Sequence, residues 1–98
     1  MSKYLFIFNG GRMPEDEAAR DAIMANWGTW MSGLGDTLVD PGSMISATSR
    51  VAASGVTTVD GPSGYVIVSA DTADAALDIA KTCPIHEGGG TVDVATIV

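Results

Sequence analysis

The chain has 98 residues, of which 46% are hydrophobic and 17% are charged, so it can bury one hydrophobic core and is too apolar to remain disordered. Twelve acidic and five basic residues give a net charge of −7, which repels the phosphates of nucleic acids and of anionic lipids. We therefore expect a single domain over residues 1–98 that binds neither nucleic acid nor a membrane surface.

The cysteine content and the start of the sequence bear on the cellular compartment. Cys83 is the only cysteine, so the chain forms no internal disulfide and does not require an oxidising compartment. The apolar run that follows Lys3 is shorter than the core of a secretory signal peptide, and no segment has the length of a membrane span. We expect a cytoplasmic protein.

The first third of the sequence predicts a strand followed by a helix. Residues 3–8 (KYLFIF) are continuously apolar or aromatic and end at Asn-Gly-Gly, which is typical of a buried strand that ends in a turn. Residues 14–34 predict a helix, because proline and three acidic residues suit its first turn and an apolar stripe follows. The stripe consists of Ile23, Trp27, Trp30, Met31 and Leu34.

The middle of the sequence, residues 36–62, mixes short apolar pieces with turn-forming residues. Asp40-Pro41-Gly42 predicts a turn. Residues 45–52 predict a modest strand, and Gly55 marks the place where a hairpin would begin.

The last third repeats the order of a strand and then a helix. Residues 64–70 form a second unbroken apolar run, and residues 71–81 carry an apolar face with helical spacing before Pro84 stops the helix. Residues 91–98 alternate apolar and polar positions and predict a terminal strand. The predicted order is strand, helix, strand, strand, helix, strand.

This order is that of an α+β protein of the ferredoxin-like, or split βαβ, type, with an antiparallel sheet and both helices on one face. The strands at 3–8 and 64–70 are apolar at nearly every position, but two helices cover only one face of a sheet. We expect a second copy to cover the open face in a homodimer, with any pocket between the sheet, the helix ends and the partner.

The stretch TCPIHEGGG, residues 82–90, holds the only cysteine and the only histidine of the chain. A metal site needs three or four ligands, so we expect neither a metal nor a cofactor. Cys83 is expected to be a buried thiol at the end of a helix, because Pro84 interrupts the turn that a Cys–His pair would need. His86 is either a solvated loop histidine or a general base at the rim of a pocket.

Three other residues are candidates for a site. Trp27 on the helical stripe is either a core aromatic or part of a ligand-binding site. Arg50, flanked by small polar residues, is either a surface arginine or the residue that holds an anionic group. Asp40 is either a turn carboxylate or the group that orients His86.

Four stretches, taken together, resemble the YCII-related family, and specifically its DGPF-domain branch. They are KYLFIFNGG at the start, WGTWMSGLGDTLVDPG with its two tryptophans, VDGP, and GYVIVSADTADAALDIAKTCPIHEGGGTVDV. The resemblance covers most of the chain. It implies a ferredoxin-like domain that dimerises into a barrel-like α/β assembly, in a family for most of whose members no activity is established.

The sequence departs from the family pattern in two places. Ser63 stands where the name-giving Asp-Gly-Pro-Phe motif has phenylalanine, and the shorter loop after it implies a different pocket mouth. Some members of the wider family carry a proposed catalytic pair, a histidine on the first helix and an aspartate directly before a proline after the second. Here the first helix has residues such as Met24 and Asn26, and Cys83 precedes Pro84, so neither member of the pair carries over.

We therefore expect a homodimeric domain that binds a small molecule. One alternative is a hydrolase-type or lyase-type enzyme acting on a small polar or aromatic substrate, with His86 as acid–base, Asp40 as its orienting carboxylate and Arg50 as anion holder. The other is a module that regulates a partner protein through its acidic surface.

Overall fold

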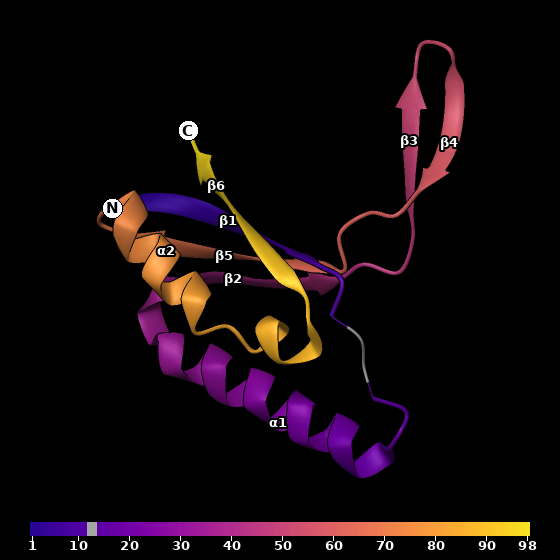
Figure 1. Cartoon of the computed structure of the whole chain (residues 1–98). Helices are drawn as coiled ribbons and strands as arrows, with labels where there is room; N and C mark the ends of the chain where they lie inside the picture. Colours follow the sequence, from indigo (N-terminus) through magenta and orange to yellow (C-terminus); the bar gives the residue numbers. More distant parts are fainter. Residues whose placement is uncertain (12–13) are drawn as a thin grey trace.

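The computed structural model describes residues 1–11 and 14–98 as an α+β fold (Figure 1). The elements in chain order are β1 (Ser2–Asn9), α1 (Glu17–Leu34), the 3-10 turn η1 (Gly35–Thr37), β2 (Leu38–Met44), β3 (Thr48–Ala52), β4 (Gly55–Val59), β5 (Gly64–Ala70), α2 (Ala73–Lys81), the 3-10 turn η2 (Pro84–Gly88) and β6 (Thr91–Ile97). In this part of the chain, no helix is both long enough and apolar enough to cross a membrane.

The main sheet has four strands in the order β2-β5-β1-β6, and all neighbouring strands are antiparallel. β1 lies at its centre, with Phe6 opposite Val66 of β5 on one side and opposite Val94 of β6 on the other. β3 and β4 form a separate two-stranded hairpin that projects from the end of the sheet (Figure 1). The prediction of a mixed α+β protein with two helices and antiparallel strands is confirmed.

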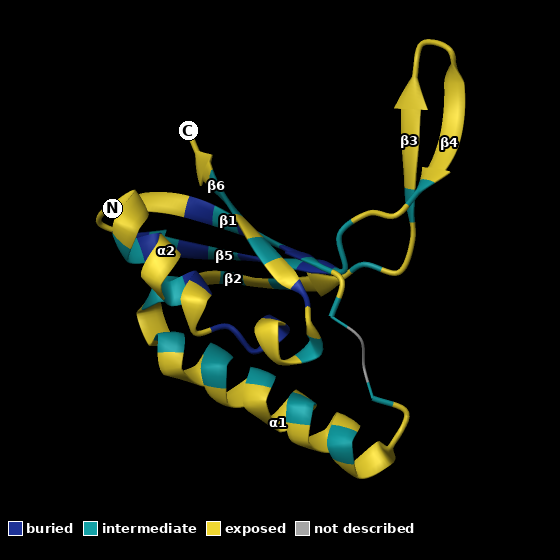
Figure 2. Cartoon of the chain, in the orientation of Figure 1, coloured by how far each residue is buried: buried dark blue, intermediate teal, exposed yellow. Residues whose placement is uncertain are grey.

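The core lies between one face of the main sheet and the two helices. The side chains of β5 alternate strictly between buried and half-buried, as expected for a strand with one packed and one open face (Figure 2). Phe6, Val66 and Val68 are completely buried at its centre. The other buried apolar residues are Tyr4, Phe8, Ala70, Ala76, Ala80, Cys83 and Ile85.

Both helices begin at capped residues. The Asp16 carboxylate accepts a hydrogen bond of 3.0 Å from the Ala19 backbone N–H, which places the start of α1 after Asp16 and not at Pro14. The Thr72 hydroxyl accepts one of 3.1 Å from Ala75 and caps α2 in the same way. The apolar stripe predicted for the first helix does pack on the core through four of its residues, namely Trp27, Trp30, Met31 and Leu34.

The predicted turn at Asp40-Pro41-Gly42 is wrong, because these residues lie inside β2. The pairing of β2 with β5 shifts register on both sides of Asp40, so the segment is an irregular bulge within the strand. β2 is an edge strand and Pro41 lies in its bulge, which are positions where a sheet tolerates a residue without an N–H. Gly42 has a positive φ of 69°, and a Cβ there would overlap the Tyr65 carbonyl oxygen.

A strand is present within the predicted range of residues 45–52, but it does not belong to the main sheet, as the predicted pattern required. The second strand of the predicted pattern corresponds to β2, which ends at Met44. Thr48–Ala52 instead forms β3 and pairs with β4, with Thr48 opposite Val59 at one end and Ala52 opposite Gly55 at the other. Gly55 does begin the second strand of a hairpin.

Replacing Phe6 with alanine should lower the free energy of unfolding by about 3–5 kcal/mol, because the change removes a completely buried ring from the centre of the core. Urea denaturation followed by circular dichroism measures the loss. Thr29→Ala, on the exposed surface of α1, is the control and should change stability by less than about 0.5 kcal/mol. Similar losses in both variants would contradict the assigned core.

Candidate functional site

A cavity of about 420 Å³ lies between α1, η2 and the end of the main sheet. Its volume is in the range of small-molecule sites. The lining residues are Phe8, Gly10, Gly11, Met24, Trp27, Met31, Pro41, Gly42, Ser43, Met44, Ser63, Gly64, Tyr65, Val66 and Ile85. Among the lining residues that the structure describes, only Tyr65 has an ionisable side chain, and this part of the wall is mainly aromatic, aliphatic and thioether in character.

Two local features of the sequence produce this cavity. On one wall, Met24, Trp27 and Met31 are spaced at i, i+3 and i+7, which places them on one side of α1. On the opposite wall, glycines and serines stand at the ends of β1, β2 and β5, where larger side chains would fill the space. Gly10 and Gly11 both have positive φ and turn the chain away directly after β1.

Trp27 and Trp30 have different roles although they are three residues apart. The Trp30 indole N–H donates a hydrogen bond of 3.0 Å to the Thr82 hydroxyl, which in turn donates one of 2.7 Å to the Ile79 carbonyl. Trp30 therefore joins α1 to the end of α2. Trp27 lines the cavity and packs edge-on against Phe8, with ring centroids 5.0 Å apart, and its indole N–H has no acceptor among the described residues.

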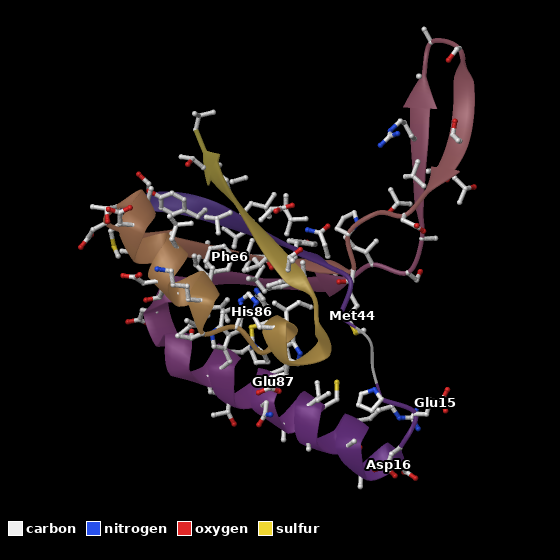
Figure 3. All side chains as sticks on the ribbon, viewed as in Figure 1. Phe6, Glu15, Asp16, Met44, His86 and Glu87 are labelled. Carbon is white, nitrogen blue, oxygen red and sulfur yellow. The ribbon has the colours of Figure 1, made fainter. Side chains whose placement is uncertain are left out.

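His86 lies on η2, where it satisfies the end of α2. Its Nε2–H donates a hydrogen bond of 3.1 Å to the Ala80 carbonyl, one of the last-turn carbonyls of α2. Figure 3 labels His86 and the neighbouring Glu87 on this segment. The Glu87 carboxylate accepts a hydrogen bond of 3.1 Å from the Asn26 amide of α1. The stretch that contains His86 thus connects both helices.

Asp40 and Arg50 lie on different elements and have different surroundings. The Asp40 carboxylate accepts a hydrogen bond of 2.8 Å from the Gly42 backbone N–H, within the bulge of β2. Arg50 is on β3 and lines a second cavity of about 310 Å³ at the base of the hairpin. The other lining residues of that cavity are Asn9, Thr48, Ser49, Val59, Asp60, Gly61 and Pro62.

The structure does not bring the four predicted site residues together. Trp27 lines the larger cavity and Arg50 lines the smaller one. His86 and Asp40 line neither cavity, and each bonds to the backbone of its own neighbourhood. Their catalytic roles stay predictions, without a shared pocket to support them.

Met24, Met31 and Met44 line the cavity but were not predicted from the sequence as site residues. Met24 and Met44 are exposed large apolar residues, with 55% and 83% of their surface accessible. The spacing of Met24, Trp27 and Met31 was visible in the sequence, but it also fits a core-facing stripe. The glycine-rich strand ends opposite this side of α1 show that it lines a cavity and is not only a core-facing stripe.

Cys83 is a buried thiol, as its place after the helix and before Pro84 predicts. Its exposed fraction is 3%, and burial raises the pKa of the thiol from 9.0 to about 11, although a hydrogen bond with the Ile85 backbone partly offsets this rise. The thiol is therefore protonated at neutral pH and a poor nucleophile. Within the described ranges, no three His, Cys, Asp or Glu side chains lie close enough to hold a metal ion.

Comparisons with known proteins give no match to this chain, either among protein-family models or among curated proteins. The function must therefore be argued from the geometry of the cavities and surfaces.

Native Cys83 should react with a disulfide reagent at pH 8 at least roughly a hundredfold more slowly than the urea-unfolded chain, because its thiol is both buried and protonated. Absorbance of the released thiolate measures the rate. Ala25→Cys in a Cys83→Ser background places a thiol on the exposed side of α1 and should react at once. Equal rates for native and unfolded protein would contradict the assignment.

The same pKa shift predicts a loss of stability at alkaline pH. The unfolded thiol ionises near pH 9.0 and the folded thiol near pH 11, so the unfolded state is favoured progressively as the pH rises between these values. Urea titrations from pH 8 to 11 should show a steeper decline for the wild type than for Cys83→Ser, in which the group is absent. If the free energy of unfolding declines equally with pH in both proteins, Cys83 does not contribute to the loss of stability at alkaline pH.

Proposed function

We propose that this protein is a homodimeric domain that binds a small, uncharged and largely apolar molecule in the cavity beside Trp27. The observation that carries the proposal is the character of that cavity, which combines a volume of about 420 Å³ with aromatic and thioether walls. Methionine side chains adapt to irregular ligands, and an indole ring offers a flat face for stacking.

The described residues of the lining carry no charged group, and this sets the class of ligand. Transfer of an ionised group into such a site is unfavourable unless a partner of opposite charge is present. None of the described lining residues is a lysine, arginine, histidine, aspartate or glutamate. Polar contacts are limited to backbone groups and to hydroxyls such as that of Ser63, which already donates to the Phe8 carbonyl at 3.1 Å. A neutral ligand with few polar atoms therefore fits best.

The proposed architecture is the ferredoxin-like type, in a member of the YCII-related family. The strand order β2-β5-β1-β6, with antiparallel neighbours throughout, supports this assignment, because the two strands that flank each helix are separated by one other strand. β3 and β4 are an insertion between the second and third strands of that pattern. The family assignment itself depends on the sequence stretches that resemble it.

The proposed homodimer forms through the face of the main sheet that the helices leave open. Leu5 and Ile7 of β1 and Tyr65 and Ile67 of β5 are on this face and are only half-buried in one chain. They are direct cross-strand pairs at the centre of the sheet, so together they form one continuous apolar surface. A second copy offers a surface of the same kind, which is the condition for a two-fold symmetric interface.

The enzyme alternative has no comparable observation in its favour. His86 and Asp40 are on different elements, and the hydrogen bonds that they form to backbone groups explain their positions. The regulatory alternative depends on the acidic surface, which is also expected of any soluble acidic domain. Ligand binding is the function with a described site.

A matched pair of fluorescent dyes tests the proposed site. N-phenyl-1-naphthylamine is neutral, and 8-anilinonaphthalene-1-sulfonate has the same rings with a negative charge. The neutral dye should bind the folded protein at least roughly tenfold more tightly than the sulfonate, because the described lining residues include no cation. Tighter binding of the sulfonate would contradict a neutral apolar site.

Substitutions on α1 locate the bound dye. Met24→Glu brings a charge to the rim of the cavity at an exposed position and should weaken binding of the neutral dye roughly tenfold or more. Ala25→Glu adds the same charge to the adjacent exposed residue outside the lining and should leave binding unchanged. In Trp30→Phe, Trp27 is the only tryptophan, and the dye should quench its fluorescence. If Met24→Glu binds as well as Ala25→Glu, the dye occupies another site.

The dimer face is tested separately. Ile67→Glu places a charge at the centre of the open face without disturbing the helix-facing core, so the wild type should be a dimer and the variant largely a monomer. Sedimentation velocity over a range of concentrations distinguishes the two. A wild type that stays monomeric at 100 µM, a concentration at which roughly micromolar dimers form, would refute the homodimer.

A further inference from the structure

The cavity at the base of the β3–β4 hairpin differs in chemical character from the cavity beside Trp27. Its volume of about 310 Å³ is at the lower end of the range for small-molecule sites. Two of its lining residues carry groups of opposite charge, the Arg50 guanidinium on β3 and the Asp60 carboxylate directly after β4. A single chain forms this cavity, so it does not require the proposed homodimer.

The alternation of side chains along β3 places Arg50 on the side of the hairpin that bears the cavity. Thr48 and Arg50 are two residues apart on one strand, so they lie on the same side, and Val59 lies there too because it is opposite Thr48. All three residues line the cavity. Val51 and Val56 form a cross-strand pair on the other side and are not among the described lining residues.

Backbone contacts hold the walls of the cavity in place. The Ser63 N–H donates a hydrogen bond of 2.7 Å to the Phe8 carbonyl, and the Ile45 N–H donates one of 2.9 Å to the Ser63 carbonyl. Gly61 lies directly against Thr48, since a Cβ at this glycine would overlap the threonine side chain. The segment after β4 is therefore fixed against the end of β1 and the start of β3. A site that is formed before the ligand arrives loses less free energy to ordering when it binds.

The two charged groups of the cavity do not neutralise each other. Arg50 and Asp60 form no ion pair, and the ion pair found among the described residues is Lys81–Asp78. Neither side chain has a hydrogen-bond partner in the part of the chain that the structure describes. Both residues are exposed, so water solvates the two groups. A guanidinium and a carboxylate are therefore both available to one ligand.

This pair of groups selects the class of ligand. A simple anion would be attracted by Arg50 and repelled by Asp60, and a simple cation would meet the reverse combination. An apolar molecule would displace water from both groups without replacing its hydrogen bonds. A zwitterion satisfies both, because its carboxylate accepts hydrogen bonds from the guanidinium and its ammonium group donates to the Asp60 carboxylate. Val59 and Pro62 offer apolar contact to the hydrocarbon part of such a molecule.

We propose that the cavity at the base of the hairpin binds a small zwitterion, an amino acid with a short hydrocarbon chain, between Arg50 and Asp60. Arg50 holds the carboxylate, the role considered for it from the sequence, and Asp60 holds the ammonium group. This site goes beyond the proposed function, because the two cavities share no described lining residue and their ligands differ in charge.

Four probes with five carbon atoms test the match between charges. Norvaline and 5-aminopentanoate are isomeric zwitterions with their charges close together or far apart, whereas pentanoate and pentylamine each keep one charge. Chemical shifts of the isotope-labelled protein at neutral pH and low salt give the dissociation constants. At least one isomer should bind roughly tenfold more tightly than either singly charged probe and shift the amides of residues 48–50 and 59–61. If pentanoate or pentylamine binds as tightly as the better isomer, or if the shifts lie elsewhere, the proposal is overturned.

Substitutions assign each charge of the ligand to one residue. Arg50→Gln and Asp60→Asn should each weaken binding of the better isomer roughly tenfold or more, because each change removes one of its two partners. Asp60→Asn should also strengthen binding of pentanoate, since the group that repels it is gone, and a purely structural role of Asp60 would not produce this gain. Arg20→Gln and Asp21→Asn make the same changes at exposed positions of α1 outside the lining and should leave binding unchanged.

The two site variants are expected to fold, because both residues are exposed, and circular dichroism verifies this. Wild-type affinity for the better isomer in either folded variant would overturn the proposal.

Discussion

The two helices of this chain cover one face of a four-stranded sheet, and most features of the molecule depend on that constraint. The packed face is occupied by large side chains that alternate along β1 and β5, with Phe6 completely buried at the centre. The strands themselves are apolar on both sides, so the face away from the helices exposes leucine, isoleucine and tyrosine side chains. An interface is the usual reason for an apolar surface of this kind.

The cavity beside Trp27 depends on how the two helices are joined to each other. Trp30 bonds Thr82 at the end of α2, Asn26 bonds Glu87, and His86 bonds the Ala80 carbonyl. These contacts place α1 over the end of the sheet, where glycines leave the space that Trp27 and its methionine neighbours enclose. His86, which was selected from the sequence as a candidate site residue, therefore helps to hold the helices in place and does not line the cavity.

The sequence predicted the elements that have a strong periodic signal. β1, β5 and β6 and both helices were recognised because their apolar residues repeat at the spacing of a strand or of a helix. β2 was missed because Pro41 and Gly42 interrupt it, and only its pairing with β5 shows that the interruption is a bulge. β3 lies within the strand predicted over residues 45–52 but was assigned to the wrong sheet, because a strand of small polar residues carries no signal for the sheet to which it belongs.

The candidate site was predicted only in part, for a similar reason. Trp27 was selected from the sequence and lines the larger cavity, and Arg50 lines the smaller one. His86 and Asp40 were selected for their chemical groups, but the sequence does not show that backbone groups nearby already use those atoms. A local hydrogen bond is invisible in a pattern of residue types, whereas an apolar stripe is visible, which explains why the packing residues were easier to identify.

The bulge in β2 connects the hardest part of the sequence to the proposed site. Pro41 and Gly42 lie in the bulge between the paired residues Asp40 and Ser43, and both line the larger cavity. A regular strand at this edge would carry alternating side chains, and one of them would extend into the space opposite Trp27. The positive φ of Gly42 brings its backbone against Tyr65 and keeps that space free. The residues that obscure the strand in the sequence are thus the ones that shape the cavity, so the local irregularity coincides with the proposed site.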